Sequence, residues 1–423
     1  MPMAIPMCGG CISCIGTAHP SHLEKMTRNT SFASTSKASA PVTGQPDNLL
    51  GMALGIGDTG ILAKVEQAIA KLIPTQISLF ARNHPDIAVE ALEFDVFGFS
   101  RSAAAARHFV HEIKRDHASP LLPVVQATGV KRVPTFVAQH DFRVNFVGLF
   151  DTVVAHASQA DGFDVRRQGT DPIKVALPEG CARKVVQLVA RDEHRANFML
   201  TTVSPPHQEI ALPGAHSDLG GGYRDDHEGP LMLIKPIRSL EAPIERDGNH
   251  YMPLPEQTEA WRQADTLRQL WKLHLGAIDD DHLRVDGWVR MEGQTARHAG
   301  AQRIRQPVAY ATLRLDRPID WRYQLIPLRV MHRHAVAAGV AFGSIDDDDP
   351  NYSLPTELQP IADQLLAGQA LSHAQENLLA RRYLHQSANW NLSSFQRSTG
   401  PELIYFNRPD PSAKRSVLGN QNK

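Results

Sequence analysis

Phe-Asp-Val-Phe-Gly-Phe-Ser-Arg-Ser-Ala-Ala-Ala-Ala-Arg, residues 94–107, runs from a short apolar segment directly into a row of alanines. The apolar segment, 94–97, is typical of a buried strand, and apolar residues at helical spacing predict a helix over Ala103–Lys114. A second buried strand is predicted at Val144–Phe150. Strand, helix and strand over about 55 residues form the βαβ unit of a doubly wound, mostly parallel α/β sheet.

Further elements are predicted on both sides of this unit. Apolar periodicity indicates a helix at Ile61–Leu72 that Pro74 ends. More helices are predicted at Lys184–Arg195 and Leu328–Val340, with a strand at Glu209–Leu212 between them. The glycine-rich segment that precedes the first helix lacks the Lys-Ser/Thr ending of a phosphate loop, so we interpret it as a tight turn.

The composition suggests one large domain with additions. Residues 1–48 are rich in Ser, Thr and Ala and are predicted to be a flexible leader. A catalytic α/β domain is predicted over residues 49–415, followed by a short tail, 416–423. Within that domain the periodic pattern loosens over about 224–320, which we interpret as an insertion or lid.

Charge and hydropathy exclude several classes of protein. The 423 residues carry 44 Lys and Arg against 45 Asp and Glu, so the broad positive charge of a nucleic-acid binder is missing. No apolar run approaches the roughly 20 residues that a membrane-spanning helix needs. With 42% hydrophobic and 21% charged residues, the chain is not a disordered one.

Cysteine is scarce, with a cluster at Cys8, Cys11 and Cys14 and a single further residue, Cys181. This pattern is no disulfide framework and favours a reducing compartment during folding. The cluster has the spacing of a metal or iron–sulfur loop, but it lacks a nearby fourth ligand, so we favour an incidental tail. The N-terminus also lacks the charged and apolar regions of a secretory signal, so export would need another route.

Ser100 stands in the motif Gly98-Phe-Ser-Arg-Ser102, between the predicted strand and the predicted helix. This is the context of a nucleophile elbow, in which a tight turn lifts a serine hydroxyl clear of the sheet. Strand and helix pass close together there, so the flanking residues must be small, and Ser102 takes the place of the usual second glycine. The backbone N–H of Arg101, at the start of the helix, is a predicted oxyanion donor.

Asp151 directly follows the second predicted strand. In open α/β sheets, functional groups gather beyond the carboxyl ends of the strands. An acid there can hold a histidine in one tautomer and stabilise the imidazolium that forms during attack. The alternative is that Asp151 caps the turn that follows. We favour the catalytic role.

His216 lies in the segment Pro213–Tyr223, which follows a predicted strand and contains three consecutive glycines. Such glycines let the backbone approach a site closely. His216 is the predicted general base, and Ser100, Asp151 and His216 follow the Ser–Asp–His order of α/β-hydrolases. His385, near the end of the chain, is the alternative base.

These segments resemble the catalytic domain of the type VI secretion lipase effectors, a family of α/β-hydrolase phospholipases. The resemblance extends from about residue 50 to 415, and His-Ser-Asp-x-Gly-Gly-Gly-Tyr is a specific motif within it. The matching segments are residues 98–104, 148–153, 191–195, 213–223, 381–391 and 405–409.

The resemblance implies that the serine, aspartate and histidine chosen above form a catalytic triad that needs no cofactor or metal. It makes three further residues candidates for supporting that triad: Asp192, Asp218 and His385. Family members usually begin with a strand ending in Asp-Gly-Thr beside the nucleophile, and no such strand is recognisable here. Residues before Leu49 are too polar for a buried central strand, so we expect the sheet to begin one strand short.

The sequence therefore predicts a serine esterase that cleaves membrane phospholipids and acts as an antibacterial effector. The resemblance implies peripheral membrane contact only, a secretion-machinery component and an immunity protein as partners, and passage from the bacterial cytoplasm to the periplasm of a target cell. Two alternatives stay open. The chain could be a catalytically impaired or truncated hydrolase-like protein that acts as a binding module, or a hydrolase of other esters or thioesters, since fold does not fix substrate.

Overall fold

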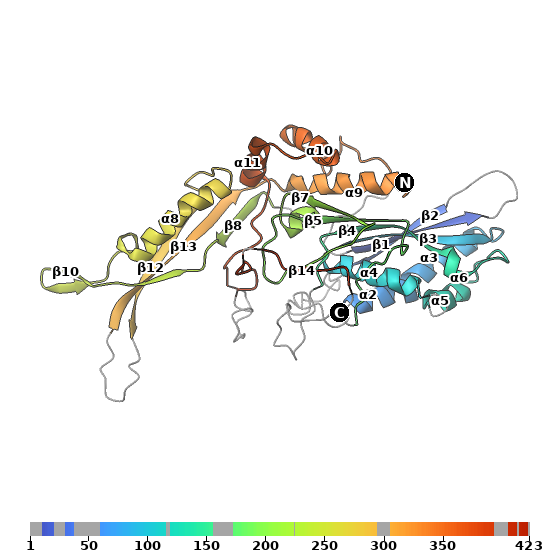
Figure 1. Ribbon diagram of the computed structural model, residues 1–423, viewed down its shortest axis with the longest axis horizontal. Coiled ribbons are helices and arrows are strands. Elements are labelled where there is room, and N and C mark those ends of the chain that lie inside the picture. The colour runs from blue at the N-terminus through green and yellow to red at the C-terminus, as the bar shows by residue number, and fades with distance from the viewer. Residues whose placement is uncertain are drawn as a thin grey trace, which may run out of the picture. The chain divides into compact units, whose positions relative to one another are not determined.

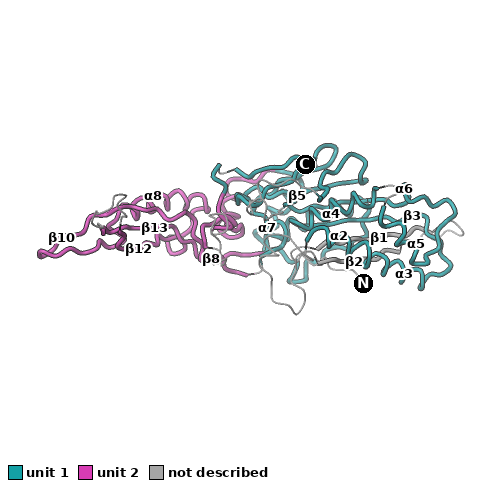
Figure 2. Tube along the Cα trace, turned by 90° about the horizontal axis from the view of Figure 1, so that it is seen from below, with its two compact units in different colours: residues 1–223, 322–369, 410–423 teal, residues 224–321, 370–409 magenta. Residues whose placement is uncertain are grey.

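A computed structural model describes most of the chain. It covers the backbone of residues 11–20 and 30–37, and residues 60–115, 119–154, 172–223, 225–293, 305–392, 405–412 and 414–421. The chain divides into two compact units (Figure 2). The first comprises residues 1–223, 322–369 and 410–423, and the second comprises 224–321 and 370–409. The domain limits expected from the sequence stay predictions.

The first unit is built on a six-stranded sheet with the order β2-β1-β3-β4-β5-β7 (Figure 1). β3, β4, β5 and β7 run parallel to one another, whereas β1 and β2 are antiparallel to their neighbours. This mostly parallel sheet with connecting helices confirms the predicted α/β class. The strands are β1 Cys11–Pro20, β2 Thr30–Lys37, β3 Val89–Phe99, β4 Phe142–Phe150, β5 Lys184–Ala190 and β7 Gln208–Leu212.

Helices cover both faces of this sheet, with α2 to α5 along one face and α9 along the other (Figure 1). The α4 helix packs closely on the sheet because Ala103–Ala106 are small and fully buried. The helices of this unit are α2 Ile61–Gln67, α3 Ile73–Asn83, α4 Arg101–Ile113, α5 Leu121–Ala127, α6 Ala138–Asp141, α7 His216–Gly220, α9 Leu325–Ala337 and α10 Gln359–Leu366.

The helix that Pro74 was expected to end continues past it. A π-helical stretch, Ala68–Leu72, joins α2 to α3 without a break. Pro74 is the second residue of α3, which directly follows the π-helical stretch. The proline therefore coincides with a change of helix type and not with a helix end.

The helix predicted at Lys184–Arg195 was wrong, because residues 184–190 form the strand β5. All but the first of its residues are buried. A strand covered on both faces is apolar throughout, and such a run cannot be told from a buried helix by periodicity. Three β-branched valines in this segment favour the strand.

The expectation that the sheet begins one strand short was also wrong. β1 pairs antiparallel with β3, with Ser13 opposite Phe97 and Thr17 opposite Glu93, and β2 pairs with β1 in turn. Two segments of the predicted leader thus occupy the edge beside β3. A bare sheet edge presents unpaired N–H and C=O groups, and these accept a neighbouring strand largely through its backbone. Polarity alone therefore did not exclude these residues.

The second unit contains more regular structure than the loose pattern over 224–320 suggested. A four-stranded antiparallel sheet of β8, β9, β12 and β13 packs against the long helix α8. Its elements are β8 His227–Met232, β9 Ile237–Leu240, β10 Ile244–Arg246, β11 Asn249–Tyr251, α8 Glu259–His274, β12 Leu283–Gly293, β13 Arg305–Pro318 and α11 His373–Arg382.

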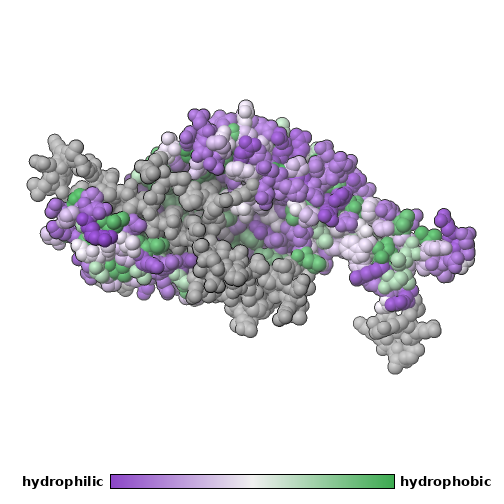
Figure 3. All heavy atoms as spheres, turned by 180° about the vertical axis from the view of Figure 1, so that it is seen from behind, coloured by the Kyte–Doolittle hydropathy of each residue, from purple (hydrophilic) through white to green (hydrophobic). Residues whose placement is uncertain are grey.

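Half-buried and exposed residues alternate along β12, as expected when one face of a sheet meets solvent. Polar and hydrophobic residues are interspersed over the surface seen in Figure 3. Large exposed apolar residues of the second unit are Leu240, Ile244, Tyr251, Met252, Leu254, Leu270, Leu273, Trp288, Met291 and Leu392. Within the described residues, no helix has the length and apolarity to cross a membrane.

Candidate active site

Three predicted site residues follow parallel strands of the first unit at the carboxyl edge of the sheet. Ser100 follows β3, Asp151 follows β4, and His216 follows β7 as the first residue of α7. The last residues of β3 and β4, Phe99 and Phe150, lie directly opposite each other. The sheet therefore brings together residues that lie far apart in sequence, at the edge where α/β sheets carry their sites.

The backbone at Ser100 has the shape of a nucleophile elbow. Its φ is 57°, which is unusual for a residue with a side chain, and α4 begins at the next residue. The Ser100 N–H donates to the Phe150 carbonyl at 2.9 Å. A Cβ at Gly98 would lie 2.3 Å from the Ser102 carbonyl oxygen, so only glycine fits where strand and helix cross.

Asp151 is fully buried and has a positive φ of 47°. One carboxylate oxygen, Oδ1, accepts the Ala190 N–H at 2.9 Å. The other, Oδ2, lies 2.5 Å from Nδ1 of His216. This carboxylate thus pairs with a histidine, in the manner that an acid of a triad requires.

His216 is held between aromatic rings. The Phe99 ring lies 4.4 Å from the imidazole, centroid to centroid, and the Phe198 ring lies 5.0 Å away in an edge contact. Because Nδ1 donates to Asp151, Nε2 is the nitrogen left to accept a proton. Burial lowers the pKa of His216, although the hydrogen bond and charge of Asp151 act against it.

Arg415, which the sequence analysis did not single out, also binds Asp151. Its Nη1 and Nη2 donate to the two carboxylate oxygens at 2.7 and 2.8 Å. Burial opposes ionisation of Asp151, but Arg415 and His216 outweigh it and hold the pKa of that carboxyl well below its usual range. No local motif marks an arginine so far along the chain from its partner.

Glu193 and Arg195 form a second ion pair beside His216. The Glu193 Oε2 accepts the backbone N–H of His216 at 3.2 Å and is 2.8 Å from Nη2 of Arg195. The Arg195 guanidinium lies over the Phe198 ring, 3.3 Å from its centroid. Burial disfavours the Glu193 charge, but Arg195 lowers the pKa of Glu193 to about 2. The motif Arg-Asp-Glu-His-Arg contained this pair, although only its aspartate was singled out.

The three predicted supporting residues occupy different positions. Asp192 Oδ2 accepts the Gly214 N–H at 2.7 Å, and Asp218 Oδ2 accepts the Ala215 N–H at 2.8 Å. Both carboxylates thus bind the backbone of the turn that leads to His216. His385 is buried in the second unit, and the histidine that contacts Asp151 among the described residues is His216.

Two polar groups at the elbow have no partner in the described structure. Nη1 of Arg101 and Oγ of Ser102 are both buried without a hydrogen bond. Burial lowers the pKa of the Arg101 guanidinium. A buried donor left unpaired costs free energy, so the unpaired Nη1 of Arg101, next to Ser100 in the chain, is a candidate contact for an anionic group.

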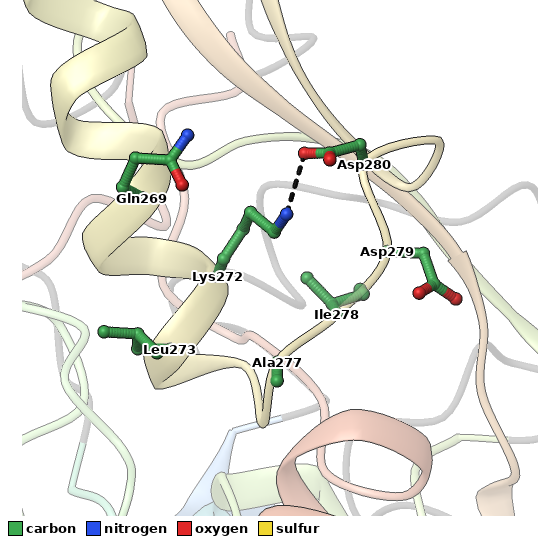
Figure 4. Close-up of a pocket in the computed structure, with 7 residues that line it drawn as sticks. All are labelled: Gln269, Lys272, Leu273, Ala277, Ile278, Asp279 and Asp280. Carbon is green, nitrogen blue, oxygen red and sulfur yellow. Dashed lines mark hydrogen bonds and ion pairs between the residues drawn. The ribbon is translucent and has the colours of Figure 1, made fainter.

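Other candidate sites are weaker. A pocket of about 370 Å³ lies at the end of α8 in the second unit, where Lys272 and Asp280 already form an ion pair (Figure 4). The described residues contain no group of three side chains suited to hold a metal. Of the cysteine cluster, Cys8 and the side chains of Cys11 and Cys14 lie outside what the structure describes. The glycine segment 51–59 also lies outside it.

Comparison with known proteins points to one family. Residues 123–241, which include Asp151 and His216, match the model "T6SS, Phospholipase effector Tle1-like, catalytic domain". The structure of the Tle1 effector bound to the VgrG spike from the type 6 secretion system is 27% identical in sequence, with a TM-score of 0.66. That similarity covers 87% of this chain and 76% of the other. The resemblance to the type VI secretion phospholipase effectors is confirmed.

An uncharacterized protein from Pseudomonas aeruginosa is 17% identical over 75% of this chain and 34% of its own, with a TM-score of 0.33. That score is too low to bear on the fold. No curated protein matches the chain. The resemblance therefore rests on the match to the Tle1-like catalytic domain and on the Tle1 effector structure.

Proposed function

We propose that this chain is a serine hydrolase that cleaves acyl esters of membrane phospholipids, with Ser100, His216 and Asp151 as its triad. The observation that carries the proposal is the 2.5 Å contact between His216 Nδ1 and Asp151 Oδ2, beside a serine held at a positive φ between strand and helix. The similarity to Tle1-like phospholipase effectors supports the substrate class. The α/β-hydrolase-like arrangement and a lid role for the region around 224–320 are part of this proposal.

The reaction would proceed by acyl transfer. Nε2 of His216 takes the Ser100 proton while the hydroxyl oxygen attacks the ester carbonyl, and Asp151 stabilises the imidazolium. The backbone N–H of Arg101, in the first turn of α4, would donate to the oxyanion. His216 then protonates the leaving alcohol, and water activated by the same nitrogen releases the acyl group from Ser100.

The unpaired Arg101 guanidinium favours an anionic substrate. A phospholipid carries its phosphate only a few bonds from the ester that is cleaved, and a guanidinium binds phosphate through two parallel hydrogen bonds. Arg101 follows the nucleophile directly in the chain. We therefore assign it the lipid phosphate as its partner.

The route to the substrate is proposed by similarity. The Tle1 effector was solved bound to a VgrG spike, so a spike protein is the proposed carrier for this chain. Delivery by this carrier would bring it from the bacterial cytoplasm to the periplasm of a rival cell. An immunity protein in the producing bacterium is a further proposed partner.

Phospholipid vesicles provide the test. The purified chain should release fatty acid from them, and Ser100→Ala should abolish the release without a change in unfolding temperature. A fluorophosphonate probe should label the wild type and not Ser100→Ala. His216→Ala should lose as much activity as Ser100→Ala, since members of a triad act as a unit, whereas His385→Ala should lose less.

Equal fatty-acid release by the wild type and Ser100→Ala would contradict the assignment of the nucleophile. Vesicle binding without hydrolysis or labelling would favour the alternative, a hydrolase-like binding module. Hydrolysis of short esters alone would favour a hydrolase with another substrate. Each outcome separates one candidate function from the others.

A further inference from the structure

Residues 416–421, which follow Arg415, contact other parts of the first unit. β14, Val417–Leu418, pairs in parallel with β6, Leu200–Thr201. The Asn420 side chain accepts the Leu177 N–H at 2.8 Å and donates to the Leu177 carbonyl at 2.9 Å. The pairing of β14 with β6 fixes the chain just after Arg415, and the Asn420 contacts add stability farther along the chain.

All three guanidinium nitrogens of Arg415 have partners. Nη1 and Nη2 bind the two oxygens of Asp151, and Nε donates to the Phe198 carbonyl at 2.7 Å. The Arg415 side chain is 9% exposed and that of Asp151 is 0% exposed. A guanidinium that binds both oxygens of a carboxylate restricts rotation of that carboxylate. A lysine ammonium, which makes a single-point contact, does not.

The charges around His216 make Arg415 important for its protonation. Besides Asp151, the charged groups that face His216 are Glu193 and Arg195. These two neutralise each other through a 2.8 Å ion pair. Asp151 is therefore the anion that most favours protonation of His216, and Arg415 partly neutralises the charge of Asp151.

We propose that Arg415 is a positioning residue of the hydrolytic site. It holds the Asp151 carboxylate in the orientation that receives Nδ1–H of His216, and its positive charge keeps His216 in the neutral, proton-accepting form at mildly acidic pH. This inference rests on the proposed function. It assigns the C-terminal segment a part in catalysis that no local motif indicates.

The direction of the pH effect follows from the charges. Without Arg415, burial would raise the pKa of Asp151, because His216 alone would oppose it. Where Asp151 is ionised, Arg415 would no longer partly neutralise its negative charge. That charge would then raise the pKa of the His216 imidazole. The reaction needs Asp151 ionised and His216 neutral. Both changes therefore move the acidic limb of the rate profile to higher pH.

The experiment compares Arg415→Met, Arg415→Lys and the control Asn420→Ala in the full chain. The measurement is kcat/KM for a short-chain nitrophenyl ester across pH. Arg415→Met should move the acidic limb upward by about one pH unit and lower kcat by about 10- to 100-fold. Arg415→Lys keeps the positive charge but loses the two parallel hydrogen bonds. Its acidic limb should therefore lie between those of the wild type and Arg415→Met. Asn420→Ala should lower the unfolding temperature and leave the limb in place.

A second readout does not need turnover. The far-downfield proton of the His216–Asp151 hydrogen bond, assigned by its absence in His216→Ala, should titrate at higher pH in Arg415→Met than in the wild type. Unchanged limb and unchanged titration in a folded Arg415→Met would overturn the inference. If Arg415→Met does not fold, Arg415→Lys with a wild-type limb and wild-type kcat overturns it. A wild type that cleaves no ester, with a shifted titration in the variant, would refute the proposed function and leave the inference on His216 standing.

Discussion

Ser100 and Asp151 carry side chains at backbone conformations that favour glycine. Among the described residues, four that are not glycine have a positive φ, and the other two are Asp247 and Ala277. Such strain costs of the order of 1–3 kcal/mol and persists where the surrounding structure enforces it. At Ser100 the Phe150 carbonyl and the start of α4 enforce it. The strain coincides with two residues of the proposed triad, which directly follow the adjacent strands β3 and β4.

A glycine at position 100 should therefore separate stability from activity. Ser100→Gly relieves the strain that Ser100→Ala retains, so Ser100→Gly should be more stable than Ser100→Ala by about 1 kcal/mol. Both variants should lack ester hydrolysis. Urea unfolding of the two variants measures the difference directly. Equal stability of the two would mean that the backbone at Ser100 is unstrained.

Arg101 provides a test of substrate recognition at the same turn. Arg101→Met removes the guanidinium and leaves the backbone N–H. Hydrolysis of phospholipid should fall at least about tenfold more than hydrolysis of an uncharged diacylglycerol, because only the phospholipid offers a phosphate to the guanidinium. Parallel kinetics on vesicles and on diacylglycerol micelles give this ratio. Equal losses on the two substrates would assign Arg101 a purely structural part.

Sequence analysis singled out Ser100, Asp151 and His216 because each lies in a short motif next to a recognisable strand. Arg415 could not be found in this way. Its partner Asp151 lies far away in the chain, and the contact exists only because β14 pairs with β6. Local sequence patterns reveal residues whose partners are close in the chain. An ion pair between residues far apart in the chain can be recognised only once the fold is known.

At the scale of single elements, the same limit explains the errors in secondary structure. β3, β4 and α4 were predicted because a strand-to-helix junction changes both residue size and periodicity. β5 was taken for a helix because burial on both faces removes its alternation. Pro74 was taken for a helix end, although the helical backbone continues through it after a π-helical stretch. Whether such a segment forms a helix or a strand depends on tertiary packing, which the residues of the segment alone do not reveal.

α4 depends on a buried arginine for its attachment to the sheet. Arg107 is fully buried and donates to the carbonyls of Val175, Thr201 and Thr202 and to Oε1 of Gln187, at 2.7 to 3.0 Å. Burial lowers the pKa of Arg107 to about 9. The helix therefore carries its charge into the core only because four acceptors surround it.

Arg107→Met should destabilise the first unit by about 3–5 kcal/mol, since it removes four buried hydrogen bonds at once, although Oε1 of Gln187 and the Thr201 carbonyl each keep a second donor. Arg115, just beyond the same helix, is an exposed control that pairs with Glu112. Arg115→Met should change the unfolding free energy by less than about 1 kcal/mol. Chemical unfolding measures the unfolding free energy of both variants. A loss in Arg107→Met as small as that in Arg115→Met would show that water replaces the Arg107 donors.

At the scale of the whole molecule, buried titratable groups should make the first unit sensitive to acid. Burial lowers the pKa of His108, His216 and His334 from the ordinary 6.5, so the unfolded chain takes up these protons first as pH falls. The pKa of Glu193 is about 2 in the fold, against an ordinary 4.5. Its stabilising contribution is present above pH 4.5 and is lost as pH falls toward 2. Both effects lower stability in acid.

Asp95 on β3 acts in the opposite direction. Burial raises its pKa from 3.8 to about 6, although a hydrogen bond from Asn145 works against this. The folded form therefore favours a protonated Asp95, and this carboxylate costs stability at neutral pH that is recovered as pH falls from about 6 toward 3.8. A shift of about two pKa units corresponds to about 2–3 kcal/mol.

Two substitutions should separate these contributions by sign. At pH 7, Asp95→Asn should stabilise the first unit by about 2–3 kcal/mol, and Glu193→Gln should destabilise it because Arg195 loses its partner. Below about pH 4, the gain from Asp95→Asn should vanish because the wild-type carboxyl is then protonated in both states. The loss from Glu193→Gln should shrink over the same range, as the wild-type glutamate becomes protonated in the unfolded chain. Urea unfolding of the wild type and the two variants between about pH 3 and pH 7 measures the change in unfolding free energy that each substitution causes at each pH. A constant gain from Asp95→Asn at every pH would show that Asp95 is ionised in the fold at no cost and that its benefit comes from packing instead.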